Sequence, residues 1–470
     1  MDTNTQTCTG LTNVLIPMGV KSVGNDAFRG CTGLANVVIP SSVTSIGSSA
    51  FYGCDNIETL AFNTNAVGSI FGGKTSLKTV EIGEDVTLIA ASAFSGCANL
   101  ASVNIGKSVE TVGDNAFKNC VALTSIEIPG SVVSLGNSAF AGCTGLSSLE
   151  IPSSVTSIYG FAFSGCTGLA DVVIPNGVTS ISTSAFDGCN NIETLAYNTD
   201  AVNSHFNGFT SLKTVEIGDD VTQIAASAFS GCTNLASVNL GKSVESIGDK
   251  AFLNCVALNG IDISESTKGI GISAFEGCTG LASVNIGKSV ESIGDKAFLN
   301  CVALNGIDIP ECAKSIGISA FEGCMELKSV IGGVGLTNIS KRAFYGCKRL
   351  TEIHIGSKVE NIGDEAFNGC MMLRVYNHAE FPQDCGTDVF SIIKSNCKLY
   401  VMEESQDFYR AHKDWYEFNI LPLTAEMLDI TSVEAATPSA KTYIDLTGKK
   451  VITPQRGQVY LQDGKKVMTR

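Results

Sequence analysis

Residues 31–54 read CTGLANVVIPSSVTSIGSSAFYGC, and this stretch decides the fold. Val37 and Ile39 alternate with their neighbours, a pattern that predicts a short β-strand with one buried face. Pro40 ends the strand because proline cannot donate a hydrogen bond to a sheet. The segment that follows Gly47 predicts a turn and then one helical turn that places Phe51 in the core.

The same pattern recurs along most of the chain. Fifteen of the 18 cysteines repeat at steps of 23 residues, or of 43 residues where a 20-residue unit intervenes with Lys74 or Phe209 in the cysteine position. These lattice cysteines are Cys8, Cys31, Cys54, Cys97, Cys120, Cys143, Cys166, Cys189, Cys232, Cys255, Cys278, Cys301, Cys324, Cys347 and Cys370. A self-similar period of this length with L-x-x-L-x-L spacing is typical of leucine-rich repeats.

The expected fold is a repeat solenoid, with short parallel β-strands on one face and helical-turn or loop crossovers on the other. No single unit can bury its apolar side, so stacked neighbours supply the core. About 17 coils at ~4.8 Å per strand predict a solenoid roughly 80 Å long. We expect the solenoid to cover 1–422 with a C-terminal cap at about 371–422, then a linker at 423–440 and a small hairpin-like tail at 441–470.

Composition excludes several classes of function. The formal net charge of −15 argues against a nucleic-acid partner, because binding to phosphates depends on Lys and Arg. The longest apolar runs span a few residues, far fewer than the ~18 that a membrane span requires. With only four histidines in the chain, a multi-histidine metal centre is also disfavoured.

The repeat resembles the BspA-type leucine-rich repeat in its Ala-Phe-x-Gly-Cys-x-x-Leu-x-x-Val-x-Ile-Pro core, over about residues 8–422. The segment that ends in Phe418-Asn-Ile is similar to that family's terminal cap. The resemblance implies a surface-exposed or secreted protein, since several members of the family bind extracellular-matrix proteins such as fibronectin and fibrinogen. It implies no catalytic residues and no cofactor, and it transfers no ligand site by motif.

The two ends of the chain differ from the repeats. From residue 441 onward seven basic residues face two acidic ones, and the segment resembles the C-terminal tails of secreted Bacteroides-type proteins. A solvated hairpin without a role is the alternative. The chain opens in mid-repeat without a basic or apolar leader, so we expect residues upstream of Met1 to carry the signal peptide and an N-terminal cap.

The cysteines and histidines do not form a recognisable catalytic or metal motif. The lattice cysteines lack C-x-x-C pairs and histidine partners, so we expect buried thiols that pack as small apolar groups. The spacing of Cys385 and Cys397 leaves a disulfide bond between them as an open alternative. Cys312 is expected to be an exposed thiol. The four histidines, His205, His354, His378 and His412, are expected in unrelated coils or in the cap, without a catalytic role and without a metal.

One row of side chains is the candidate binding site. In each predicted strand the residue after the central buried one points outward, and stacking aligns these residues along the solenoid. The row begins apolar, with Leu15, Val38 and Ala61, and then becomes rich in carboxylates and amides. The candidate ligand-binding residues are Glu81, Asn104, Glu127, Glu150, Glu216, Asn239, Asp262, Asn285 and Asp308.

The leading hypothesis is a non-catalytic, adhesin-like protein of the cell surface or secreted, which binds an extracellular-matrix or host surface protein through this sheet face. The row would attract a basic or hydroxyl-rich extended ligand, or weakly held Ca²⁺. We expect a monomer with no membrane span. The alternatives are a passive antigenic array without a ligand and an accessory module that holds a glycan, although aromatic residues expected near the face, such as Tyr197, occupy core positions.

Overall fold

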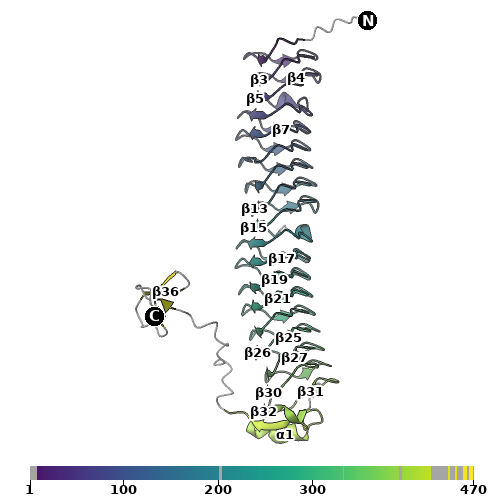
Figure 1. Cartoon of the computed structure of the whole chain (residues 1–470), viewed down its shortest axis with the longest axis vertical. Helices are drawn as coiled ribbons and strands as arrows, with labels where there is room; N and C mark the ends of the chain where they lie inside the picture. Colours follow the sequence, from purple (N-terminus) through teal and green to yellow (C-terminus); the bar gives the residue numbers. More distant parts are fainter. Residues whose placement is uncertain are drawn as a thin grey trace. The chain divides into compact units, whose positions relative to one another are not determined.

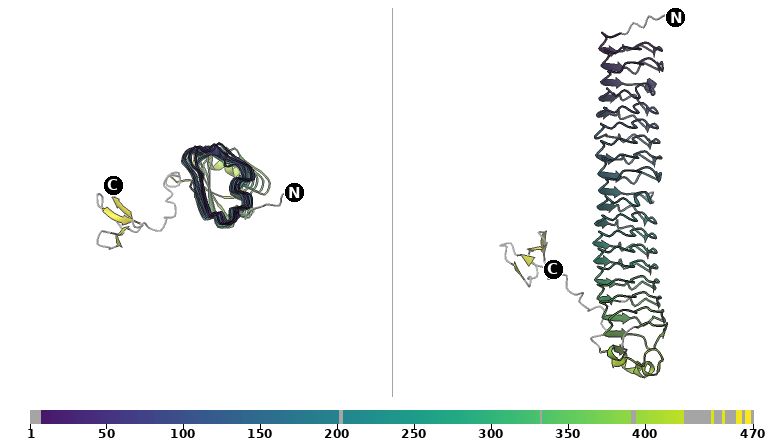
Figure 2. Two further views of the ribbon diagram at one scale, coloured as in Figure 1. Left: turned by 90° about the horizontal axis from the view of Figure 1, so that it is seen from above. Right: turned by 45° about the vertical axis from the view of Figure 1, so that its right-hand side comes forward.

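The computed structural model describes residues 8–200, 204–331, 333–390 and 394–424, together with four short strands nearer the C-terminus. The chain divides into two compact units, Met1–Pro422 and Leu423–Arg470. The first unit is a stack of repeated coils along one axis (Figure 1), and the outlines of most coils overlap when the stack is viewed from its end (Figure 2). The expected linker at 423–440 lies almost entirely outside the described residues.

A single coil follows the course that its sequence predicts. Leu34, Val37 and Ile39 are fully buried, and so is Phe51. The strand that contains Val37 alternates buried and outward positions, and it ends before Pro40. Burying four apolar side chains per coil, at about 1.5–3 kcal/mol each, provides the stacking energy that a single coil lacks.

The first strands of the coils form a parallel sheet, here called the front sheet. Its strands are β1 (Asn13–Leu15), β3 (Asn36–Ile39), β5 (Thr59–Phe62), β6 (Thr79–Ile82), β8 (Ser102–Asn104), β11 (Ser148–Glu150), β13 (Asp171–Ile174), β15 (Thr194–Tyr197), β16 (Thr214–Ile217), β18 (Ser237–Asn239), β20 (Gly260–Asp262), β22 (Ser283–Asn285), β24 (Gly306–Asp308), β26 (Ser329–Ile331), β28 (Glu352–Ile355), β30 (Arg374–Asn377), β32 (Lys398–Val401) and β33 (Asn419–Pro422). The front sheet is hydrogen-bonded in four successive segments, which break at β8/β11, β18/β20 and β22/β24.

The crossovers contain a second parallel sheet that the repeat pattern did not predict. Its two-residue strands are β2 (Ser22–Val23), β4 (Ser45–Ile46), β7 (Leu88–Ile89), β9 (Thr111–Val112), β10 (Ser134–Leu135), β12 (Ser157–Ile158), β14 (Ser180–Ile181), β17 (Gln223–Ile224), β19 (Ser246–Ile247), β21 (Gly269–Ile270), β23 (Ser292–Ile293), β25 (Ser315–Ile316), β27 (Asn338–Ile339), β29 (Asn361–Ile362) and β31 (Asp384–Cys385). The segment around Phe51 forms hydrogen-bonded turns, where a helical turn was expected.

The two 20-residue coils lack this second strand. A short 3₁₀ turn replaces it, η1 (Asn65–Val67) in the first coil and η2 (Ser204–Phe206) in the second. The second sheet is therefore interrupted between β4 and β7 and between β14 and β17. A tighter 3₁₀ turn crosses the stack with fewer residues, which accounts for the shorter unit.

The core contains a phenylalanine ladder and a cysteine ladder, and both are interrupted at the two 20-residue coils. The phenylalanine rings of neighbouring coils stack at centroid distances such as 5.5 Å between Phe140 and Phe163, with an interplanar angle of 1°. Beside them, the lattice cysteines from Cys31 onward are buried, whereas Cys8 of the first coil is exposed. The prediction that the lattice cysteines are buried is thus confirmed for all but the first.

Gly47 is required by close packing between coils. A Cβ atom on Gly47 would lie 2.5 Å from the backbone nitrogen of Asn25 in the preceding coil. Gly53, by contrast, has a φ of +75°, a left-handed conformation that glycine adopts without strain. The two glycines of the repeat therefore have different physical roles.

The C-terminal end of the solenoid is closed by a cap. It contains η3 (Lys394–Asn396), η4 (Glu403–Ser405) and the helix α1 (Gln406–Ala411). Trp415 is completely buried and donates a hydrogen bond from its indole to the carbonyl of Gln383 at 2.9 Å. Its ring packs edge-on against Phe390, the last ring of the phenylalanine ladder, so the cap covers the end of the core.

The second unit contains a four-stranded antiparallel sheet. Its strands are β34 (Tyr443–Ile444), β35 (Lys450–Val451), β36 (Val459–Gln462) and β37 (Lys465–Met468), in the order β35-β34-β36-β37. A role for this segment in sorting stays a prediction. Among the described residues of the whole chain, no helix has the length and apolar character that a membrane crossing needs.

Candidate functional site

The nine candidate residues lie on the solvent side of the front sheet, at one position of successive coils. We call this line of side chains, from Leu15 to Tyr400, the outward row. All nine candidates are exposed. The ladder register places them in line, as in Ala61–Glu81–Asn104 and in Ala196–Glu216–Asn239. Neighbours on adjacent parallel strands are spaced ~4.8 Å apart, so the row is a regular series of polar groups.

Amides follow several of the carboxylates within the row, whereas Glu127 and Glu150 are neighbours without an amide between them. The side-chain amide of Asn104 donates a hydrogen bond to Oε2 of Glu81 at 2.9 Å, and Asn239 donates in the same way to Glu216 at 2.9 Å. Like charges in directly opposite positions would destabilise the sheet. Where Asn follows Glu, as at Glu81–Asn104 and Glu216–Asn239, the surface is acidic without that repulsion.

The row is interrupted at Glu127. Residues 125–127 form no ladder pairing with either neighbour, so a gap opens in the front sheet between β8 and β11. A pocket of about 440 Å³ lies at this gap, and both Glu127 and Glu150 line it. Two carboxylates therefore border a depression at this gap, which the sequence pattern did not predict.

The row has an apolar beginning. Leu15 is 73% exposed and Val38 is 39% exposed, in register with each other. A second pocket of about 450 Å³ lies at this end of the stack, lined by Leu11, Val14 and Phe28 among others. The first coils thus present apolar surface where the middle coils present charge.

The last coils of the row are aromatic, which the sequence analysis missed. His354, Tyr376 and Tyr400 follow one another in register, with ring centroids 4.4 Å and 5.0 Å apart. A sheet face with aromatic side chains would favour glycan binding only if ring faces were available. Here the rings stack on one another, so the faces between them are occupied, and this arrangement does not favour the glycan-binding alternative.

Two of the four histidines come together, contrary to the expectation that all four lie in unrelated places. Nδ1 of His354 lies 3.1 Å from Nε2 of His378, one coil further on. His205 is buried in η2 with Nε2 3.0 Å from the carbonyl oxygen of Ile181, and burial lowers its pKa. His412 lies in the cap.

The buried thiols are poorly suited to nucleophilic chemistry. From Cys54 to Cys370, each lattice cysteine donates a hydrogen bond to a phenylalanine carbonyl of a neighbouring coil, as Cys166 does to Phe140 at 3.1 Å. Burial raises the pKa of Cys97 to about 11 and that of Cys143 to about 12. A nucleophilic cysteine needs a lowered pKa, so these thiols belong to the core. Cys385 and Cys397 are also free thiols, and Cys312 is exposed as expected.

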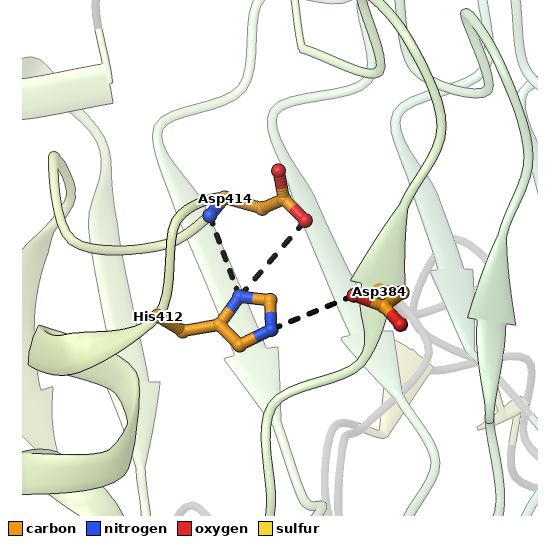
Figure 3. Close-up of side chains that lie close together, drawn as sticks. All are labelled: Asp384, His412 and Asp414. Atoms are coloured by element: carbon orange, nitrogen blue, oxygen red, sulfur yellow. Dashed lines mark hydrogen bonds and ion pairs between the residues drawn. The ribbon is translucent and has the colours of Figure 1, made fainter.

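The cap brings together three potential metal ligands, Asp384, His412 and Asp414 (Figure 3). The two carboxylates face opposite ring nitrogens: Oδ1 of Asp384 lies 3.7 Å from Nε2 of His412, and Oδ2 of Asp414 lies 3.9 Å from Nδ1. Nδ1 also accepts a hydrogen bond from the backbone of Asp414 at 3.3 Å.

The ammonium group of Lys413 competes with any cation at this cluster. It lies 3.7 Å from Asp384 and 3.9 Å from Asp414. Asp414 further accepts the backbone N–H of Cys385 at 3.1 Å, which ties the segment after α1 to β31. These contacts indicate a cluster that fastens the cap, and we assign it that structural role.

Comparisons with known proteins agree with the repeat pattern. The family model described as "BspA type Leucine rich repeat region (6 copies)" matches residues 4–122, 67–193, 199–311 and 291–408. No curated protein matches the chain.

The solved structures that the chain resembles include three bacterial leucine-rich repeat proteins. A leucine-rich repeat protein from Bacteroides ovatus is 25% identical, with 88% of this chain and 92% of that chain covered and a TM-score of 0.46. One from Eubacterium ventriosum is 22% identical over 68% and 84% of the two chains, with a TM-score of 0.37. A leucine-rich cell surface protein from Faecalibacterium prausnitzii is 24% identical over 82% and 88%, with a TM-score of 0.32.

Proposed function

Because the chain belongs to the BspA-type leucine-rich repeat family, we propose that it is a non-catalytic binding protein, displayed on the cell surface or secreted, that holds an extracellular-matrix or host surface protein against its front sheet. The acidic part of the outward row carries this proposal. It runs from Glu81 to Asp308 and exposes side chains at a fixed repeat.

The chemistry of the row favours a basic, extended protein segment. A carboxylate or amide stands at most steps of the row, and Val173 and Ala196 interrupt it between Glu150 and Glu216. The coil spacing of ~4.8 Å is about 1.5 times the ~3.3 Å rise of an extended strand, so about three residues of a partner that follows the row would span two coils. Lysine and arginine side chains are long enough to compensate for this mismatch between the spacing of the coils and the rise of the strand.

The row needs no metal ion for its own stability. Asn104 and Asn239 direct N–H groups at the neighbouring carboxylates, which satisfies those oxygens. Ca²⁺ requires oxygen ligands, and an amide turned in this way offers none toward the carboxylate. Weak Ca²⁺ binding and a monomeric state stay predictions.

Replacing Glu127, Glu150 and Glu216 together with Gln tests the proposal. The variant keeps the shape of the side chains and removes three exposed charges from the row. At roughly 0.5 kcal/mol per exposed ion pair, we expect about tenfold weaker binding to fibronectin or fibrinogen by surface plasmon resonance. Wild-type binding should also weaken between about 0.1 M and about 1 M NaCl, as the Debye length falls from ~10 Å to ~3 Å.

A matched control removes the same number of charges elsewhere. Asp187, Glu276 and Glu322 lie in the turns after the core phenylalanines, away from the front sheet. Their replacement by Asn and Gln should leave affinity and salt dependence as in wild type. Equal binding by both triple variants would exclude the acidic row and direct attention to the apolar coils around Leu15 and Val38. The absence of any saturable binding would favour the passive antigenic array.

A further inference from the structure

The histidine pair at the C-terminal end of the front sheet results from a shift in register. His354 lies in β28, and its ladder partner in β30 is Tyr376, 22 residues further on. Side chains two residues apart in a strand share a face, so His378 lies on the same side as Tyr376 and diagonal to His354. The two imidazoles thereby meet at the surface, with Nδ1 of His354 3.1 Å from Nε2 of His378.

Both rings are held in place by their surroundings. His354 stacks on Tyr376 at 4.4 Å with an interplanar angle of 10°, and the rings of His354 and His378 are nearly parallel, at 16°. The backbone N–H of His378 donates to the carbonyl of Ile355 at 3.0 Å. The preceding residue, Asn377, is fully buried and hydrogen-bonded to Gln383 at 2.8 Å. The pair is therefore pre-organised, which reduces the entropy cost of binding.

Both imidazoles are suited to donate a lone pair at neutral pH. Burial lowers the pKa of His354, and burial together with the neighbouring His354 lowers the pKa of His378 to about 4. A metal ion binds only the neutral form of histidine, so no proton needs to be displaced from a charged ring. One of the two facing nitrogens carries a proton in the present hydrogen bond, and a change of tautomer through solvent moves that proton to the outer nitrogen of the same ring.

We propose that His354 Nδ1 and His378 Nε2 chelate a divalent transition metal ion, with Zn²⁺ or Cu²⁺ as the fitting class. Metal–imidazole bonds of about 2.0–2.1 Å at tetrahedral or square angles separate two adjacent nitrogens by about 2.9–3.4 Å, which includes the observed distance. Imidazole suits zinc, copper and nickel, whereas Ca²⁺ and Mg²⁺ prefer oxygen. The proposal is independent of protein binding by the acidic row.

The pair supplies only part of a coordination sphere. Among the described residues, the only group of three or more His, Cys, Asp or Glu ligands is the cap cluster of Asp384, His412 and Asp414. The ion at His354 and His378 would thus keep positions for water, or for a donor atom from a molecule bound at the aromatic end of the front sheet. Such a site is open in the manner of catalytic and bridging metal sites, unlike a closed structural one.

The test is a Zn²⁺ titration of the untagged full chain by isothermal calorimetry. The exposed thiols Cys8 and Cys312 would also bind zinc, so the background carries Cys8→Ser and Cys312→Ser. We expect one Zn²⁺ per chain and no corresponding heat with Ca²⁺. His354→Gln and His378→Gln should each lower the affinity at least about tenfold, the lower end of the loss caused by changes around a metal site. His412→Gln is the matched control and should bind as the parent does.

A second measurement uses the protein with all four histidines in place, so its result does not depend on whether the histidine variants fold. The chain has only four histidines, so their ring signals can be resolved by NMR. Zn²⁺ should shift the signals of His354 and His378 and leave those of His205 and His412 unchanged. Loss of binding in His412→Gln, unchanged binding in both other variants, or no binding at millimolar Zn²⁺ would each overturn the proposal.

Discussion

Raising the pH above about 9 should unfold the solenoid steeply. Burial raises the pKa of the ladder thiols, to about 11 for Cys97 and to about 12 for Cys143, Cys189 and Cys232. An unfolded thiol ionises near pH 8.5, whereas a folded one stays neutral. Stability is therefore unaffected below the unfolded pKa and is lost as the pH rises from there toward the folded pKa.

The number of thiols makes the effect large. Each one costs about 1.4 kcal/mol of unfolding free energy per pH unit in this window. Eleven lattice cysteines from Cys97 to Cys347 have raised pKa values, so an all-or-none transition would lose on the order of 10 kcal/mol per pH unit. Urea midpoints measured between pH 7 and pH 10.5, with reductant and without oxygen, check this.

A matched variant assigns the effect to the thiols. Replacing Cys143, Cys166 and Cys189 with Ala removes three titrating groups, and the slope should fall by about 4 kcal/mol per pH unit. The carbonyl of Phe140 that Cys166 contacts still accepts the backbone N–H of Cys143, so no acceptor is left unpaired. Urea midpoints that do not change with pH, or an unchanged slope in the triple variant, would contradict this account of the ladder.

Phe163→Ala should destabilise the middle of the solenoid by about 3–5 kcal/mol, the cost of deleting a buried aromatic ring. Phe163 is completely buried and stacks between Phe140 at 5.5 Å and Phe186 at 5.4 Å. Because each coil contacts only its neighbours, the break should also separate the two halves of the stack. We therefore expect two transitions in the urea unfolding curve of the Phe163→Ala variant and a single transition in that of the unsubstituted protein.

The chain offers a control two residues away. Phe161 is 50% exposed, so Phe161→Ala removes the same group from the surface. Its φ of +58° is equally unfavourable for phenylalanine and alanine, so the backbone contribution cancels. A change within about 0.5 kcal/mol is expected. Similar losses in the two variants would show that the phenylalanine ladder does not hold the coils together.

The repeat unit was predictable because its pattern is reiterated. The strand containing Val37, the buried Phe51 and the buried lattice cysteines all follow from apolar spacing. The second sheet was not predictable, since strands of two residues such as Ser45–Ile46 leave no periodicity to read. The 3₁₀ turns occur where a 20-residue unit has three residues fewer than the usual 23. The pattern of apolar positions does not predict which local conformation such a shorter unit adopts between its front strand and its core phenylalanine.

The candidate row was predictable only where the register stays constant. A step of 23 residues would pair His354 with Asn377 and put Tyr376 in the core. The structure pairs His354 with Tyr376 at a step of 22, and Asn377 takes the buried position. One residue fewer between Cys370 and its strand reverses which side chains face solvent. The aromatic end of the row and the histidine pair were missed for this reason.

The central claim is that a protein partner lies along the acidic part of the outward row. Carboxyl footprinting tests it most directly: exposed carboxylates are coupled to glycine ethyl ester by a carbodiimide, with and without saturating fibronectin or fibrinogen, and located by mass spectrometry. The account predicts that Glu127, Glu150 and Glu216 are protected in the complex, while Asp187 and Glu276 are labelled as in the free protein. Full labelling of the three row carboxylates in a saturated complex would contradict it.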